Sequence, residues 1–493
     1  MHFIVGTPQP SSEETTIYLK PNTRWNDYSF ITEFHASIVK GNKTTVLGEV
    51  KIGFLEQNEA AETPASLKQH FKALPDTFFS LGQNPEYYEN LRSALETTEI
   101  KAYLSALRDV AYDENIFEIA YREKVFTESL SRFVSISTIK GQFREIISTG
   151  VSLKNYGFIY THENGEGIAF KVNPNSKPPT NVHALIGGNG VGKSHILRNI
   201  ANSIDKKDGT IKKLNGYHIS AYDFGQLIYL SLGVFGNPIK NIDFNDSRLR
   251  IDRTKKKYIG IYDQNTAQLK DISTEMAREF AGSLYNCLHG SKIRHDKLRN
   301  ALELLAVDTN FQEIELEELS QLKSEEEIKT KAAFIFSSLS SGHASVLYYI
   351  TSIVEIIEDR TICLLDEPEN HLHPPLLAAF IRTLSEILTE SNGIAIIATH
   401  SPVVIQEVPR SCVWKVDNEG GFSRPNIETF GESIGDITSD VFNLDMRKSG
   451  FYSLLESEVK KGIEFREIIK LYQGQIGSEG RAIIIAHAPR ANK

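Results

Sequence analysis

The sequence predicts an α/β protein built around a phosphate-binding loop, and three apolar runs with polar ends carry this prediction. Residues 182–186 form a short apolar run that leads into a glycine-rich stretch at 187–194. Two further apolar runs, 361–365 and 394–398, are followed by an acidic pair and by a Thr-His pair. Uninterrupted apolar runs of this length are typical of strands buried on both faces, as in a parallel sheet covered by helices.

The glycine-rich stretch fits the phosphate-binding pattern G-x-x-x-x-G-K-[ST] at every defined position. Its glycines let the backbone wrap an anion without a Cβ in the way, and a helix predicted over 195–204 directs its positive end at the same point. In such loops the lysine reaches the β- and γ-phosphates and the next hydroxyl ligates Mg²⁺. We therefore expect ATP and Mg²⁺ as cofactors. The expected nucleotide contacts are Gly187, Gly188, Asn189, Gly190, Val191, Gly192, Lys193 and Ser194, the last also as a metal ligand.

Length and composition describe a soluble protein with more than one domain. The chain has 493 residues, more than one ordinary core holds, with 40% hydrophobic and 24% charged residues. Its formal net charge of −9 gives no overall attraction to nucleic acid, so such binding requires a local basic patch. The three cysteines are widely spaced and fit no metal or disulfide framework, and no apolar run approaches bilayer-spanning length. We expect a cytoplasmic protein without a membrane partner.

Residues 1–150 predict a separate α+β domain of unknown role, with short strands first and helical spacing later, at 91–107 and 116–133. Asp27, Glu49 and Lys51 form D…E-x-K, in which two carboxylates hold Mg²⁺ and a lysine assists the attack of water in restriction-type nucleases. Any strand with alternating charges beside an aspartate gives the same pattern. A nuclease in the N-terminal domain therefore stands beside a purely structural interpretation.

The nucleotide-binding part begins near residue 150, with two antiparallel strands predicted at 156–160 and 167–172. A further strand predicted at 217–220 leads toward Gln226. A glutamine at a strand end is a candidate ligand of Mg²⁺ and a partner of the attacking water. A solvated loop glutamine is the alternative.

Two polar strand ends carry candidate catalytic groups. Asp366 is placed to bind Mg²⁺ directly or through water, and Glu367 to orient and polarise the attacking water. His400 is placed to sense the γ-phosphate. With Lys193, Glu367 and His400 form the expected catalytic set.

Another motif, at 339–343, opens a helix predicted to continue to 357. Ser340 is placed to cap this helix, and the backbone amides there can hold a γ-phosphate, so Ser340 and Gly342 are candidate nucleotide-binding residues. A phosphate already wrapped by a loop of its own chain is normally completed by a second protomer. We therefore expect a homodimer or a higher homo-oligomer.

Between 230 and 335 the charge is uneven, and 313–327 is acidic. A basic patch in this region is a candidate to bind DNA through phosphate contacts. A solvated helical face, or a docking site for an acidic partner protein, explains the same residues. The basic residues are Arg248, Arg250, Arg253, Lys255, Lys256 and Lys257, followed by Lys292, Arg294, Lys297 and Arg299.

Together these motifs resemble the ATP-binding-cassette (ABC) ATPases, and more closely their soluble branch with RecF, the SMC proteins and the OLD-family nucleases. The resemblance covers about residues 150–420. It implies an ATP-hydrolysing P-loop head at 151–420 with an antiparallel β-subdomain and a helical insertion at 230–335. The residue patterns on either side of it predict an N-terminal α+β domain at 1–150 and a C-terminal helical segment at 421–493.

The resemblance also assigns roles to the motifs. Residues 187–194 become the Walker A loop, 339–343 the signature motif and 364–368 the Walker B motif, with Glu367 as catalytic glutamate. His400 becomes the switch histidine and Gln226 the Q-loop candidate. His371 and His373 have an H-x-H spacing that suits a metal, but in this family setting a structural and interface role is favoured.

The chain departs from several members of this group. His343 stands where transporters carry glutamine, and Ser341 replaces a glycine. The 144 residues between Ser194 and Leu339 leave no room for SMC-type arms, and no D-x-D of a Toprim nuclease follows His400. The chain therefore resembles stand-alone ATPases of bacterial anti-phage systems such as Septu and PARIS, whose nuclease or toxin is a separate protein. A RecF-like repair ATPase is the alternative.

Overall fold

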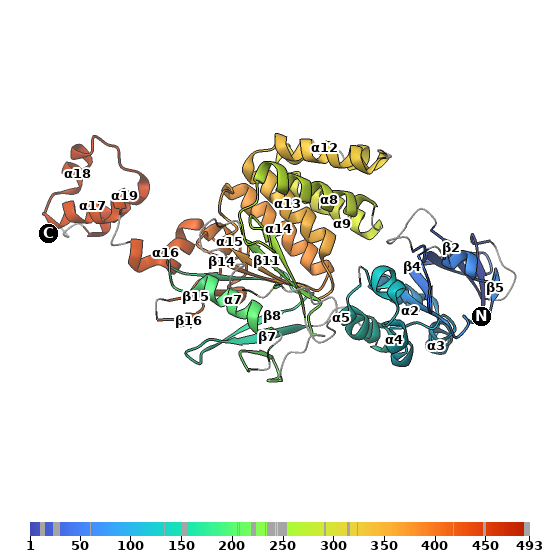
Figure 1. Cartoon of the computed structure of the whole chain (residues 1–493). Coiled ribbons are helices and arrows are strands. Elements are labelled where there is room, and N and C mark those ends of the chain that lie inside the picture. Colours follow the sequence, from blue (N-terminus) through green and yellow to red (C-terminus); the bar gives the residue numbers. More distant parts are fainter. Residues whose placement is uncertain are drawn as a thin grey trace.

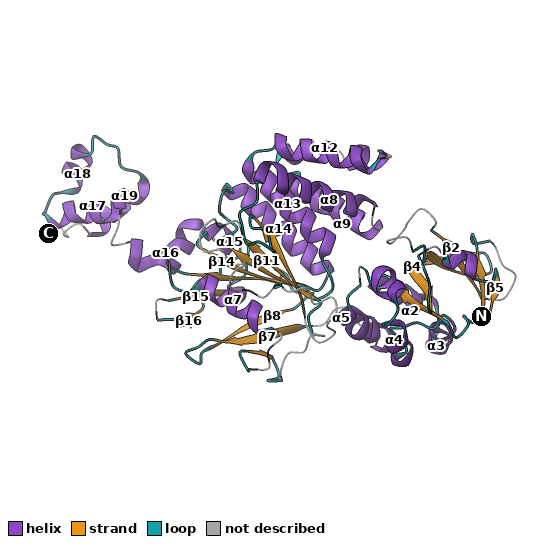
Figure 2. Ribbon diagram, in the orientation of Figure 1, coloured by secondary structure: helices purple, strands orange, loops and turns teal. Residues whose placement is uncertain are grey.

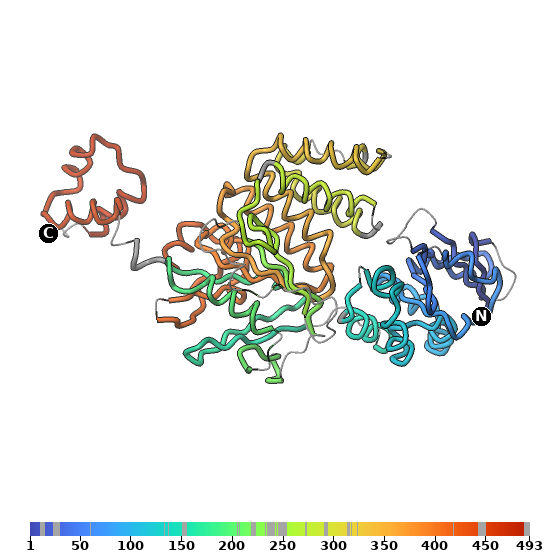
Figure 3. Tube along the Cα trace, in the orientation of Figure 1, coloured from blue at the N-terminus to red at the C-terminus, as the bar shows by residue number. Residues whose placement is uncertain are grey.

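The computed structural model is an α/β protein with three sheets in the part of the chain that it describes (Figure 1). An N-terminal region, a central head at 155–446 and a small group of C-terminal helices follow one another across the view (Figure 3). Among the described residues, no helix is both long and apolar enough to cross a bilayer. The described residues are 1–9, 15–22, 30–59, 61–132, 134–149, 155–204, 206, 208–217, 223–231, 233, 242, 244, 254–289, 292–312, 316–322, 324–417, 419–446 and 450–487.

The N-terminal region contains a six-stranded sheet. Its strands are β1 (His2–Val5), β2 (Thr16–Pro21), β3 (Glu33–Lys40), β4 (Lys43–Phe54), β5 (His70–Phe71) and β6 (Phe78–Gly82). They lie in the order β5-β1-β2-β3-β4-β6, and β3 and β4 form an antiparallel hairpin. At its turn Gly41 has a φ of 59°, a conformation that side chains disfavour.

Helices follow this sheet and complete a core of their own, separate from that of the head. They are α1 (Thr63–Ser66), α2 (Pro85–Ala94), α3 (Thr97–Ala106), α4 (Glu114–Ala120), α5 (Ile136–Thr138) and α6 (Arg144–Thr149), with π-helical turns η1 (Phe126–Leu130) and η2 (Ile139–Phe143). The helical pattern at 91–107 is divided between α2 and α3, because Glu96 and Glu99 form a capping box that starts α3.

The head is built on a seven-stranded sheet. Its strands are β9 (Val182–Ile186), β11 (Gln226–Ser231), β12 (Lys255–Gly260), β13 (Ile362–Asp366), β14 (Ile394–Thr399), β15 (Val413–Val416) and β16 (Phe422–Ser423). The order is β12-β11-β13-β14-β9-β15-β16, and only the β15–β16 pair is antiparallel. The three apolar runs of the sequence are β9, β13 and β14, and their buried side chains confirm the predicted burial on both faces.

Helices cover both faces of this sheet (Figure 2). They are α7 (Lys193–Ser203), α8 (Ala277–His289), α9 (Lys292–Leu305), α10 (Thr309–Gln312), α11 (Leu316–Gln321), α12 (Glu325–Ser338), α13 (Ser341–Ile356), α14 (Pro374–Glu390), α15 (Pro402–Gln406) and α16 (Ile434–Met446), with the short turns η5 (Ile272–Met276) and η6 (Arg410–Cys412). α13 and α14 lie on one face, α8 packs on α12 and α13, and α7 lies on the other face against β13 and β14.

A small antiparallel sheet lies on the α7 side of the head. Its strands are β7 (Tyr156–Thr161), β8 (Gly167–Val172) and β10 (Ile211–Lys213), in the order β10-β7-β8. β7 and β8 are the predicted antiparallel pair, because their register runs from Tyr156 opposite Val172 to Thr161 opposite Gly167.

Two predicted segments of the head differ from the structure. The helical insertion predicted at 230–335 contains β12, an edge strand of the main sheet, so its helical part begins only with η5. The C-terminal segment predicted from 421 begins with β16, and α16 then packs on α15. Beyond these points, the domain limits stay a prediction.

The N-terminal region contacts the head at the loop before β13. Arg360 of this loop forms an ion pair with Glu145 of α6, at 3.4 Å. Beside it, a cavity of about 120 Å³ is lined by Lys51 from one part and by Lys297 and Asp359 from the other. Burial raises the pKa of Asp359 to about 7. The loop that leads into β13 is therefore held by charged groups of both parts.

The C-terminal helices have a small core of their own. They are α17 (Gly450–Lys460), α18 (Phe465–Leu471) and α19 (Ser478–His487). Leu455, Ile468 and Ile484 are buried among them. These three helices lie in the C-terminal segment that was predicted to be helical.

Candidate functional site

The candidate site lies at the carboxyl ends of three adjacent strands, β13, β14 and β9. Parallel pairing places Asp366 beside Ala398, and Thr399 beside Ile186. The loop after β9, the acidic pair at the end of β13 and His400 after β14 therefore meet at one edge of the sheet. This edge is where open α/β sheets bind their ligands.

The loop at 187–194 needs glycine at several positions. Gly190 and Gly192 have φ values of 79° and 97°, which favour glycine. At Gly187 a Cβ would lie 2.2 Å from the carbonyl oxygen of Val416. A Cβ on Gly190 or Gly192 would meet no atom within 4 Å, so these parts of the loop face open space. The loop has the form of a cradle that can receive a phosphate.

The ammonium group of Lys193 lies inside this loop. Nζ donates to the carbonyl oxygens of Gly187 at 3.1 Å and Gly188 at 2.9 Å, and it lies 2.8 Å from Nε2 of His400. Burial lowers the pKa of Lys193 to about 8, against the effect of nearby carboxylates. A desolvated ammonium with uncharged hydrogen-bond partners gains strongly from an anionic ligand.

Ser194 and Asp366 form a pair that can hold Mg²⁺. Oγ of Ser194 donates to Oδ1 of Asp366 at 2.7 Å, and the hydroxyl of Tyr229 donates to Oδ2 at 3.2 Å. Adjacent oxygen ligands of octahedral Mg²⁺ lie about 2.9 Å apart, so the first two oxygens have a suitable spacing. Burial raises the pKa of Asp366, and a bound cation would favour its ionised form.

Glu367 faces the same space with a partly exposed carboxylate. Its φ is 50°, and its N–H donates to the carbonyl oxygen of Ala398 at 2.9 Å. Oε1 lies 3.5 Å from Nε2 of His400, and Oε2 accepts from Nδ2 of Asn370 at 3.3 Å. The side chain is 40% exposed, so a water molecule can reach the carboxylate.

Glu369, in the loop after β13, positions His400. Its Oε1 accepts from the N–H of His400 at 2.6 Å and from the hydroxyl of Thr399 at 2.8 Å. Burial raises the pKa of Glu369. Burial, with the charge of Lys193, lowers the pKa of His400, which favours the neutral ring.

The motif at 339–343 caps α13 as predicted. Oγ of Ser340 accepts from the N–H of His343 at 3.5 Å and lies 2.6 Å from Nδ1 of the same ring. Gly342 packs closely on the loop after β13, because a Cβ there would lie 2.9 Å from the carbonyl oxygen of His371. Within the described residues, Ser340 thus contacts its own helix rather than the loop at 187–194.

The prediction that Gln226 ligates Mg²⁺ is wrong. Gln226 is the first residue of β11, whose last residue, Ser231, pairs with Asp366. Five steps of strand, about 17 Å, therefore separate Gln226 from the edge that carries the site. Its buried amide donates to the carbonyl oxygen of Ile356 and to the hydroxyl of Thr361. It stabilises the opposite edge of the sheet.

The predicted basic patch is only partly described. Arg248, Arg250 and Arg253 lie outside the described residues. Lys255, Lys256 and Lys257 form the first half of β12, at the edge of the sheet, and Lys255 pairs with Glu358 at 3.0 Å.

The second basic group does not form an exposed face among the described side chains. Arg294 and Lys297 line the cavity at the contact with the N-terminal region, and burial lowers the pKa of both. Arg299 pairs with Asp296 at 3.1 Å.

The D…E-x-K pattern of the N-terminal region gains no support. Asp27 lies outside the described residues. Glu49 and Lys51 are 8% and 1% exposed in β4, and Nζ of Lys51 donates to the carbonyl oxygen of Ser129 at 3.0 Å. Side chains this deeply buried do not reach a nucleic-acid strand in this structure.

Residues 235–406 match the sequence family described as "AAA domain, putative AbiEii toxin, Type IV TA system". The matched range includes the cap of α13, the acidic pair and His400. Over this range the head is therefore similar to the AAA domains of that family, and the phosphate-binding loop at 187–194 lies before the matched range.

Over nearly its whole length, the chain is 36% identical to protein ea59 of Escherichia phage lambda. The alignment spans 512 residues and covers 97% of this chain and 95% of that protein. The chain belongs to the ea59 family.

Two solved structures of ABC-transporter components are also similar to part of this chain. A nucleotide-free ATP-binding cassette of an ABC transporter is 14% identical, with 60% of this chain and 98% of that chain covered and a TM-score of 0.30. The protein cbiO1 from Clostridium perfringens, part of an ABC transporter complex, is 15% identical, with 60% and 96% covered and a TM-score of 0.30.

Replacing Gln226 tests whether it lies at the edge of the sheet opposite the site. Gln226→Ala should lower the free energy of unfolding by about 1–3 kcal/mol, because two buried acceptors lose their donor. It should leave the Mg²⁺ dependence of nucleotide binding unchanged, whereas Asp366→Asn should weaken it. Chemical denaturation and Mg²⁺ titrations with a fluorescent ATP analogue measure the two effects. A loss of Mg²⁺ affinity in Gln226→Ala as large as that in Asp366→Asn would contradict the placement.

Proposed function

We propose that this chain hydrolyses ATP at sites completed by two copies of its head. We further propose that the cycle controls a nuclease or toxin carried by a separate protein in conflicts between phages and bacteria. The observation that carries the first part is the meeting of Lys193, Asp366 and Glu367 at one edge of the sheet, while Ser340 contacts its own helix. The cluster makes half of a hydrolytic site, and a second head has a helix N-terminus to offer it.

Each residue of the cluster has a role that its contacts suit. Lys193 exchanges its carbonyl partners for phosphate oxygens, while Ser194 and Asp366 hold the cation. Glu367 takes a proton from the attacking water, and His400 lies between this carboxylate and the Lys193 ammonium. ATP supplies the phosphoryl group, and Mg²⁺ neutralises the charge that develops on it.

Removing the general base should separate ATP binding from hydrolysis. Glu367→Gln should keep ATP affinity, lose roughly 100-fold or more in turnover and accumulate as an ATP-bound dimer. Lys193→Ala should lose ATP affinity, and Glu386→Gln, a glutamate of α14 outside the site, should behave as wild type. Phosphate release and light scattering measure turnover and dimerisation. A wild-type rate no higher than that of Glu367→Gln would indicate a scaffold gated by ATP binding alone.

The regulatory part rests on one relative and one family match. The full-length relative is a phage protein, and the family that matches the head is described by a toxin of a type IV toxin–antitoxin system. These descriptions, with the resemblance to the ATPases of Septu and PARIS, favour a role in phage–host conflict over a RecF-like role in repair.

The proteins that co-purify with the ATP-bound Glu367→Gln dimer test whether a separate effector exists. Tagged Glu367→Gln protein, purified with ATP from its own host, should retain a nuclease or toxin. The same protein carrying Lys193→Ala should lose it, because the partner depends on the ATP-bound form. Retention of a repair protein instead, or of the same partner by both variants, would contradict regulation of such an effector by ATP.

DNA is a proposed second ligand, through the region from 248 to 257. On β12, Lys256 and Lys257 are at least partly accessible, although lysines on edge strands also serve to block pairing with other sheets. The double change Lys256→Glu and Lys257→Glu should weaken DNA binding equally across sequences and reduce the log–log salt slope by about one unit per lost contact. Fluorescence anisotropy at several salt concentrations measures both. Unchanged affinity and slope would exclude this surface.

A further inference from the structure

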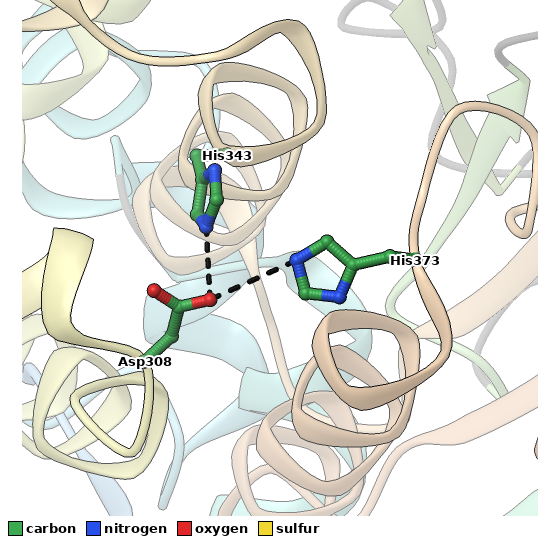
Figure 4. A group of neighbouring side chains, drawn as sticks. All are labelled: Asp308, His343 and His373. Atoms are coloured by element: carbon green, nitrogen blue, oxygen red, sulfur yellow. Dashed lines mark hydrogen bonds and ion pairs between the residues drawn. The ribbon is translucent and has the colours of Figure 1, made fainter.

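Three side chains from separate elements converge at the N-terminus of α13 (Figure 4). His343 lies in the first turn of α13, His373 caps α14, and Asp308 lies in the turn between α9 and α10. One nitrogen or oxygen atom from each lies within 4.8 Å of the other two. Oδ2 of Asp308 is 2.9 Å from Nε2 of His343 and 3.8 Å from Nε2 of His373.

We propose that Asp308, His343 and His373 bind a divalent transition-metal ion, with Zn²⁺ as the best match. Two imidazole nitrogens and one carboxylate oxygen are a ligand set that zinc accepts, with water at the fourth position. Neighbouring ligands of tetrahedral Zn²⁺ lie about 3.4 Å apart, and the two measured separations fall on either side of this value. The His373 side chain is 51% exposed, so an ion can enter from solvent.

The spacing favours an ion over a purely hydrogen-bonded cluster. His343 and Asp308 are close enough for a hydrogen bond, and this bond lowers the pKa of Asp308 to about 2. The 3.8 Å between His373 and the same oxygen is too long for one. Both rings nevertheless direct Nε2 at one carboxylate, and the side-chain amide of Asn310, 3.3 Å from Nε2 of His343, would move aside when an ion binds.

Metal binding at Nε2 would change the hydrogen bond that Nδ1 of each ring makes. With Nε2 of His343 on the ion, its proton lies on Nδ1 and is donated to Oγ of Ser340, 2.6 Å away. The hydroxyl hydrogen of Ser340 is then free to donate to an anion. This consequence rests on the proposed function, in which Ser340 contacts the γ-phosphate of a second head, whereas the metal site itself does not.

In His373, Nδ1 accepts from the N–H of Leu376 across a long 3.4 Å contact. Metal binding at Nε2 moves the ring proton to Nδ1 and removes this contact. The helix start keeps a second support, because Pro374 at its first position favours the helical backbone. Loading with zinc should therefore speed amide exchange at Leu376.

The test uses the full-length protein, treated with a chelator and free of nucleotide. Titration with Zn²⁺ against a chromophoric chelator should show a site that weakens roughly tenfold or more in Asp308→Asn and in His373→Ala. Co²⁺ should give the visible absorption of a tetrahedral site, and both variants should lose it. His371→Asn is the matched control: it lies in the same loop outside the cluster, and asparagine tolerates its φ of 68°.

Zinc affinity and cobalt absorption that stay unchanged in both variants would overturn the proposal, as would wild-type protein that binds neither ion. Melting temperatures of the variants show that they are folded. Lys193→Ala should lose ATP binding and still bind zinc. Wild-type protein that binds zinc but does not hydrolyse ATP would refute the proposed function alone.

Discussion

Parallel pairing of β13, β14 and β9 is the constraint on which the rest of the site depends. Each strand is buried on both faces and contributes one short loop at the same edge. The pairing continues one residue past the end of β13, because the N–H of Glu367 donates to Ala398. A slip of β14 by one residue would exchange the faces of its side chains, so the register that buries the core also brings the His400 ring to within 3.5 Å of the Glu367 carboxylate.

Local signals were enough to predict this arrangement from the sequence. The glycine pattern at 187–194 has few structural solutions, and Gly190 and Gly192 adopt the left-handed conformations that such a loop needs. Ser340 caps α13 because a serine followed by a helical apolar pattern offers the backbone a natural start. The binding roles of these residues remain predictions, since the structure supports them by geometry alone.

The errors concern residues whose position depends on distant parts of the chain. Gln226 begins a strand instead of ending one, and only the pairing of β11 with β13 reveals this. Tyr229 reaches Asp366 through the same pairing, so no local pattern pointed to it. Arg294 and Lys297 belong to a basic cluster in sequence but line a cavity against the N-terminal region. Charge spacing does not show which face of a helix another domain covers.

The ion pair between Arg360 and Glu145 connects the N-terminal region to the start of β13. This strand is five residues long and hydrogen-bonded on both sides, so it is stiff along its axis. Its first end follows the loop that holds Arg360, and its last residue is Asp366. A ligand that displaced α6 would shift the loop that holds Arg360 and, with it, the first residue of β13. This shift would change the affinity for a cation at Asp366, the last residue of the strand. Thermodynamic linkage makes the effect reciprocal, so occupancy at Asp366 would alter affinity in the N-terminal region by the same factor.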